Sequence, residues 1–143
     1  MTPDTNKALV RHFMERAFNA GDLTIVDAAL TQDGIDHQEP LGANFAMHLK
    51  AVITMLRTAF PDLHFEIHDM LAEGELVAFR STMTGTHRGP FQGLPPTGKS
   101  ISVAHMHFVR VVEGKTSDLW HVWDTAGLMR QLGTAAAPQP QAV

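Results

Sequence analysis

Two short stretches carry the side chains best suited to moving protons. The segment AHMH places His105 and His107 two residues apart, and WHVWD ends in Asp124. Removing a proton next to a carbonyl needs a base of raised pKa and a hydrogen-bond donor for the enolate oxygen. The tryptophans around Asp124 would desolvate its carboxylate and raise its pKa. These residues are therefore compatible with acid–base chemistry in which Asp124 carries a proton.

Asp124 also has a structural interpretation, because aspartate is a preferred N-cap residue of a helix. A helical pattern follows it, with Leu128, Met129 and Leu132 on one side. Thr125 could cap the same helix, so capping alone does not require Asp124.

The HMH spacing permits further interpretations. Alternate residues of a strand lie on one side, so His105 and His107 could bind zinc or iron beside Asp124. Two histidines and one carboxylate are a small ligand set, and we predict no metal. Each histidine alone is also compatible with an ordinary place at the edge of the core.

The composition excludes several classes of protein. The 143 residues are 44% apolar and 18% charged, which predicts one domain over residues 1–134, followed by a disordered tail at 135–143. A net charge of −4 argues against nucleic-acid binding. Neither a membrane span nor a signal peptide is visible, and there is no cysteine, so we expect a cytoplasmic protein without disulfides.

The elements that must position these side chains follow in two blocks. Apolar residues at helical spacing predict three helices, at residues 4–20, 22–30 and 44–60. Strand-like segments then flank two Glu-Gly pairs, at 73–74 and 113–114, each of which we predict to be a hairpin turn. Helices followed by an antiparallel meander predict an α+β fold, a curved sheet wrapped on helices.

The second hairpin decides which side chains share a face. A two-residue turn at 113–114 places His107 opposite Trp120, and His105 on the same face as Asp124 and diagonal to it. The other face is apolar enough to be buried as well. We therefore predict a homodimer, or a higher even oligomer, packed through Ala104, Met106, Phe108, Leu119 and Trp123.

The first hairpin and the loop after it add two candidate binding groups. A turn at 73–74 makes Asp69 and Arg80 diagonal neighbours, either as an ion pair that lets Arg80 be buried or as an arginine that binds a substrate oxyanion. Residues 87–99 are rich in glycine and proline, so they form a loop. We expect this loop to be a lid that brings Phe91 or Leu94 over the pocket mouth.

Two longer strings resemble a known family. GTHRGPFQGLPPTGK and WHVWDTAGLMRQLG, together with RHFMERAFNAGDLTIVDAAL and IDHQEP, are similar to the SnoaL-like polyketide cyclases of the nuclear transport factor 2-like superfamily. The resemblance covers about residues 6 to 133. It implies a cone-shaped α+β barrel, with three N-terminal helices packed in a curved, mostly antiparallel sheet that encloses an apolar pocket.

The resemblance also implies a reaction and roles for residues. Members of the family close a ring by intramolecular aldol condensation of a small apolar carbonyl compound without a cofactor, with an aspartate as general acid/base. Asp124 matches that aspartate, and His107 matches the histidine that holds the substrate oxygen. The predicted substrate-binding residues are His105, His37, Trp120, Arg80 and Phe91.

Other functions remain open on the same fold. Ketosteroid isomerase uses a tyrosine in its oxyanion hole, and this chain has no tyrosine, so a steroid isomerase is disfavoured. Hydration, dehydration or hydroxylation could be catalysed on this fold instead, since fold does not fix reaction. The domain could also be a non-catalytic module that binds small molecules or a partner subunit.

Overall fold

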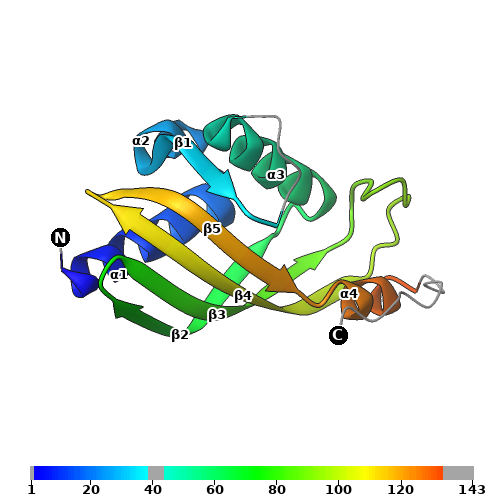
Figure 1. Ribbon diagram of the computed structural model, residues 1–143. Helices are drawn as coiled ribbons and strands as arrows, with labels where there is room; N and C mark the ends of the chain where they lie inside the picture. Colours follow the sequence, from blue (N-terminus) through cyan, green and yellow to red (C-terminus); the bar gives the residue numbers. More distant parts are fainter. Residues whose placement is uncertain (1, 39–43, 134–143) are drawn as a thin grey trace.

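The computed structural model describes residues 2–38 and 44–133, which form helices packed against one face of a curved, unclosed sheet (Figure 1). Within these ranges the strands are β1 (Leu30–Asp36), β2 (His64–Glu73), β3 (Leu76–Thr86), β4 (Ser100–Val112) and β5 (Lys115–Trp123). Their order in the sheet is β1-β5-β4-β3-β2. Only the β1–β5 pair is parallel among the described strands. The predicted mixed α+β fold is confirmed.

The helical entry agrees with the prediction in outline. The elements are α1 (Pro3–Phe13), a π-helical continuation η1 (Met14–Asn19), a 3-10 turn η2 (Leu23–Ile25), α2 (Val26–Ala29) and α3 (Phe45–Ala59). The side chains of Asp22 and Asn44 cap η2 and α3. The predicted helix at 22–30 is shorter than expected, because the chain becomes extended at Leu30 and Gly34 lies within β1.

The core lies between the helices and the inner face of the sheet. Helix α1 packs on β2 and β3, α3 packs on β1, and the last helix, α4 (Thr125–Gln131), packs on β4. Alternate residues of β4 are buried from Ile101 to Val111, and the residues between them are more exposed. Two of the buried positions on β4 hold histidines instead of aliphatic residues. The inner face of the sheet therefore carries two imidazole rings within the core.

The second hairpin has the predicted turn but not the predicted register. Glu113 and Gly114 both have positive φ, 48° and 81°, and Val112 pairs with Lys115. A bulge then intervenes: Arg110 pairs with Asp118 and Val111 with Thr116, which leaves Ser117 as an extra residue on β5. Beyond the bulge every pair is shifted by one residue, so the predicted shared faces of β4 and β5 are wrong.

The first hairpin turns at Gly74 and Glu75, one residue later than predicted, and Glu73 pairs with Leu76. Asp69 consequently lies directly opposite Arg80 rather than diagonal to it. Within the described ranges, no helix is long and apolar enough to cross a membrane. The predicted tail at 135–143 lies outside the described residues.

Candidate functional site

Three histidines line the inner face of the sheet where β4 and β5 pair. His105 and His107 are only 6% and 8% exposed, and His107 lies directly opposite His121. The rings of His105 and His107 stack with their centroids 4.0 Å apart, and His107 stacks in turn on Phe79 of β3 at 4.4 Å. Trp123 lies opposite His105, with the ring centroids 5.6 Å apart. The inner wall is therefore a continuous aromatic surface that carries ring nitrogens.

A buried carboxylate from β1 joins this wall. Asp36 is 7% exposed, and its Oδ2 lies 3.2 Å from Nε2 of His121 and 3.0 Å from Nε2 of His48 on α3. Its Oδ1 accepts the backbone N–H of Gln38 at 3.1 Å. Burial raises the pKa of Asp36, but hydrogen bonds from His121, Gln38 and His48 outweigh burial and hold the pKa below its ordinary value. Asp36 is therefore an anion near neutral pH.

The hydrogen-bonded chain continues from His121 to β4, since Nδ1 of His121 lies 3.3 Å from Nε2 of His105. Burial lowers the pKa of His105 to about 3, and it holds the pKa of His107 well below its ordinary value. Both rings are therefore neutral near pH 7, each with one N–H donor and one acceptor nitrogen. The Nδ1 atoms of both rings are buried and have no hydrogen-bond partner among the described residues. Buried polar atoms are normally paired, so these two nitrogens are suited to a bound substrate.

A cavity of about 270 Å³ adjoins this wall at the end of the sheet where α4 begins. Its lining includes Phe91 and Gln92 of the loop after β3, Trp123, and Leu128 of α4. Trp123, which lines this cavity, also stacks on His105. Figure 1 shows the loop and α4 at the same end of the molecule. We identify this cavity as the candidate route for a substrate to the inner wall.

The loop at 87–99 is fastened to the fold at its base. The backbone N–H of His87 donates to the carbonyl of Lys99, and the N–H groups of Arg88 and Gly89 donate to the carbonyl of Ala59 at the end of α3. Phe91 is only 1% exposed and packs on Phe60. The loop therefore lies beside this cavity, with Phe91 in its lining.

Asp124 lies where its motif predicted, between β5 and α4, but in different surroundings. Its carboxylate accepts the N–H of Gly127 at 2.8 Å and so caps α4. The residue is exposed rather than desolvated by tryptophans. Its backbone N–H donates to the carbonyl of Ala104, whose parity on β4 is opposite to that of His105. We predicted that Asp124 and His105 lie close together on one face of the hairpin. That prediction assumed a hairpin without a bulge, so it is wrong.

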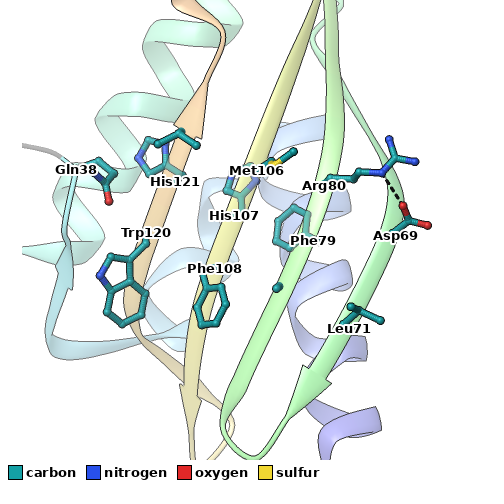
Figure 2. Close-up of a pocket in the computed structure, with 12 residues that line it drawn as sticks. Gln38, Asp69, Leu71, Phe79, Arg80, Met106, His107, Phe108, Trp120 and His121 are labelled. Carbon is teal, nitrogen blue, oxygen red and sulfur yellow. Dashed lines mark hydrogen bonds and ion pairs between the residues drawn. The ribbon is translucent and has the colours of Figure 1, made fainter. Parts of the chain in front are cut away.

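The structure places three predicted binding residues on the outer face of the sheet. Nε2 of His37 donates to the carboxylate of Asp118 at 2.9 Å, and the His37 ring stacks on Trp120 with the centroids 4.4 Å apart. Arg80 is exposed and forms an ion pair with Asp69, so the expected burial of Arg80 is wrong. Figure 2 shows this pair at the edge of the sheet, with Trp120 on the same outer side. These residues are separated from the inner wall by the sheet itself.

Apolar side chains fill the rest of this outer face (Figure 2). They border a shallow groove of about 470 Å³. The lining includes Leu71, Met106, Phe108, Trp120 and Val122, and His107 and His121 of the inner wall also border the groove. Met106 and Phe108 were predicted to lie on such a face, whereas Leu119 and Trp123 pack against the core instead.

Sequence reasoning missed Asp36, His48 and His121 as site residues. The IDH segment drew attention to His37, but side chains of a strand alternate, and here it is Asp36 that enters the interior. His121 was assigned to the wrong face by the register. No group of three or more histidine, cysteine, aspartate or glutamate side chains in the described part of the chain is arranged to hold a metal ion.

Comparisons with known proteins agree with this architecture. The family model of the SnoaL-like polyketide cyclases matches residues 8–132. Aklanonic acid methyl ester cyclase DauD from Streptomyces sp. (strain C5) is 31% identical over 131 residues, which are 87% of this chain and 80% of that protein.

Solved structures give the same result. TsrD from Streptomyces laurentii superposes with a TM-score of 0.84 at 27% identity, covering 93% of this chain and 98% of its own. AclR from Streptomyces galilaeus, described as a candidate hydroxylase, has a TM-score of 0.81 at 28% identity over 97% of this chain and 91% of its own. The fold, the family match and the curated relative together show that the chain belongs to the SnoaL-like polyketide cyclases and is an enzyme of that type.

Proposed function

We propose that this enzyme closes a ring by intramolecular aldol condensation of a small apolar polyketide-like carbonyl compound, without a cofactor. DauD is named as the cyclase of such a compound, aklanonic acid methyl ester. The observation that carries the proposal is the buried Asp36 carboxylate hydrogen-bonded to His121 on an aromatic inner wall. A carboxylate–histidine pair in a low-dielectric interior is suited to moving a proton.

The reaction needs two kinds of group, and the inner wall offers both. A base must take the proton next to a carbonyl, and a donor must stabilise the enolate oxygen that forms. Neutral imidazoles can serve in either role, since each has one donor and one acceptor nitrogen. His107 is suited to the donor role, because its Nδ1 is buried without a partner among the described residues. The stacked rings of His105, His107 and Phe79 give a flat surface for an unsaturated substrate.

Two assignments of the proton-transfer group compete. The family motif points to Asp124, and in that assignment the carboxylate would have to leave its cap on Gly127. The geometry favours the Asp36 and His121 pair, which is buried and faces His105. The predicted binding roles of His37, Trp120 and Arg80 would require a substrate on the outer face, so we propose that Phe91 and Trp123 line the substrate's path instead.

Aklanonic acid methyl ester is the probe that tests the function. In deuterated buffer the enzyme should catalyse exchange of the substrate's α-proton, seen by NMR, and formation of a ring-closed product, seen by chromatography. Asp36→Asn should reduce both rates by roughly 10²- to 10⁴-fold, the usual effect of losing acid–base catalysis. Asp124→Asn should leave them within a few-fold, since asparagine is an equally good cap.

Two results would contradict the proposal. Absence of both proton exchange and ring closure with the wild-type enzyme would refute the cyclase function. The reverse pattern, with Asp124→Asn inactive and Asp36→Asn active, would keep the function and move the proton-transfer role to Asp124.

Hydroxylation is the second candidate, because AclR has the same fold. A hydroxylase must consume dioxygen, whereas an aldol cyclisation leaves the oxidation state of the substrate unchanged. An oxygen electrode therefore separates the two: uptake of dioxygen with turnover of the substrate would favour hydroxylation.

A further inference from the structure

The loop after β3 contains a tight turn beside the cavity. The N–H of Phe91 donates to the carbonyl of Leu94 at 3.0 Å, and the N–H of Leu94 donates to the carbonyl of Phe91 at 2.8 Å. Between them, Gln92 and Gly93 have φ of 46° and 82°. Positive φ at both central residues is characteristic of a type I′ turn, for which Asn-Gly is the preferred sequence. Glutamine is therefore an unfavourable residue at position 92.

The same backbone conformation occurs at the tip of the second hairpin. Glu113 and Gly114 have φ of 48° and 81°, and Gln92 and Glu113 are the two non-glycine residues with positive φ in the described part of the chain. A β-carbon in this conformation is crowded by its own backbone, so both residues are strained. Glu113 lines neither the outer groove nor the cavity, whereas Gln92 lines the cavity. Glu113 is therefore a matched reference for Gln92.

Buried neighbours on both sides hold the backbone of Gln92 in place. Phe91 is 1% exposed and packs on Phe60 with the ring centroids 5.6 Å apart. Leu94, at the other end of the turn, packs against the same hydrophobic core. The turn is thus anchored at both ends, so the side chain of Gln92 starts from a fixed point of the cavity wall.

The rest of the cavity offers few polar groups. Its other lining residues are Phe91, Trp123, Thr125, Ala126, Leu128 and Met129, none of which is charged. The side-chain amide of Gln92 has no hydrogen-bond partner within residues 2–38 and 44–133. Small-molecule sites are mostly apolar, with a few polar groups that fix the orientation of the ligand. An uncharged lining also favours a neutral ligand, because a carboxylate would lose its hydration without gaining a cation.

We propose that Gln92 is a substrate-binding residue that contributes to specificity, and that its amide binds a neutral edge of the substrate where a carbonyl lies next to a hydroxyl. The amide supplies N–H donors for the carbonyl oxygen and an acceptor oxygen for the hydroxyl. Asparagine would relieve the strain but is one methylene shorter, so it would not reach the same groups. This inference rests on the proposed cyclase function.

Thermal denaturation shows whether the turn alone explains Gln92. Gln92→Asn and Glu113→Asn each create an Asn-Gly turn, so each should raise Tm, by about 2–4 °C. A side chain that served only to hold the loop would give the opposite result at one site: Gln92→Asn would lower Tm while Glu113→Asn raised it. That pattern would overturn the inference.

Steady-state kinetics with aklanonic acid methyl ester test the contact with the substrate. Gln92→Asn should raise KM by roughly 3- to 10-fold, the usual value of one hydrogen bond. Its kcat should stay within about two-fold, because an interaction made equally in the ground state and the transition state affects KM alone. Gln92→Glu keeps the length but cannot donate a hydrogen bond when ionised, so it should raise KM at least as much. Glu113→Asn should change neither constant.

Fluorescence of Trp123 measures binding at the cavity itself. The chain has two tryptophans and Trp120 lies on the outer face, so Trp120→Phe leaves Trp123 as the only tryptophan. Aklanonic acid methyl ester should quench this fluorescence, with a Kd that Gln92→Asn raises by roughly 3- to 10-fold.

The outcomes separate this inference from the proposed function. An active wild type would retain the cyclase function even if Trp123 did not respond to the compound, or if Gln92→Asn left Kd and KM unchanged. Either of those two results would overturn the role of Gln92 alone. Absence of ring closure with the wild type would overturn the cyclase function, and the role of Gln92 with it.

Discussion

The carboxylate of Asp124 occupies the space that a side chain at Gly127 would need. A Cβ added to Gly127 would lie 2.1 Å from Oδ2 and 2.7 Å from Cγ of Asp124. The three atoms nearest that Cβ all belong to Asp124. The cap of α4 therefore depends on the absence of a side chain at position 127, and the two residues should be coupled in stability.

A double-mutant cycle measures this coupling. Alanine is favoured over glycine within a helix by about 1 kcal/mol, so Gly127→Ala should stabilise a protein that already carries Asp124→Ala. In the wild-type background the same change displaces the capping carboxylate, which costs about 1 kcal/mol and cancels the gain. Urea denaturation of the four proteins should give a coupling free energy of about 1 kcal/mol. Purely additive effects would show that Asp124 moves aside without loss.

The buried histidines should make the protein sensitive to acid. His105 has a pKa of about 3 in the folded protein and an ordinary value of 6.5, so the unfolded chain binds the proton more tightly. The stability contributed by this group is full above about pH 6.5 and falls as the pH drops toward 3, by up to about 1.4 kcal/mol per pH unit. His107 acts in the same direction.

Chemical denaturation between about pH 7 and pH 4 tests this pH dependence. His105→Phe keeps an aromatic ring in the stack but cannot titrate, so its stability should vary less with pH than that of the wild type. Asp36 contributes with the same sign but only below about pH 4, because its pKa is lowered from 3.8. A stability that is flat from pH 7 to 4 would contradict burial of neutral histidines.

The outer face of the sheet should be an interface between two copies of the chain. Met106, Phe108 and Val122 are 56%, 44% and 62% exposed there, next to one another on β4 and β5. Contiguous apolar patches of this kind mark interaction surfaces. Light scattering should show a dimer or a higher even oligomer, and Met106→Glu should dissociate it. Met47→Glu, at an exposed methionine of α3, is the matched control and should leave the oligomer intact.

The loop at the cavity mouth should depend on Gly89. A Cβ at this position would lie 2.1 Å from the carbonyl oxygen of Thr58, which is backbone and cannot rotate away. Gly89→Ala should therefore loosen the loop and destabilise the protein by about 1–3 kcal/mol, as overpacking usually does. Trypsin should cleave the variant faster after Arg88 or Lys99 than it cleaves Pro90→Ala. Equal cleavage of the two variants would show that the loop is not held at Gly89.

Local patterns were enough to predict the helices, the two hairpins and the α+β fold. The caps Asp22 and Asn44 and the turn at Glu113-Gly114 are encoded within a few residues, so one sequence reveals them. The placement of His105 and His107 on one side of β4 also followed from simple alternation. These features need no knowledge of distant contacts.

The rest of the site depends on contacts between distant segments. Asp36 enters the interior only because β1 pairs in parallel with β5, and no local pattern in TQDGID predicts that pairing. His48 appears as an ordinary helix residue until Asp36 is seen beside it. His121 and Trp120 lie on the faces opposite to those predicted, because β5 has one extra residue at the bulge. The periodicity of the sequence alone cannot locate such a residue.

The bulge at Ser117 determines which side chains of β5 face the inner wall. Closing the bulge without deleting a residue would pair Ser117 with Arg110 and shift the rest of β5 by one position. His121 would then face solvent with the outer groove, and Trp120 and Val122 would enter the interior. The same strand thus holds two alternative surfaces, the histidine-bearing inner wall and the apolar outer groove. We expect this part of β5 to accept many substitutions and the loss of Ser117 itself, but no single-residue deletion between Asp118 and Trp123.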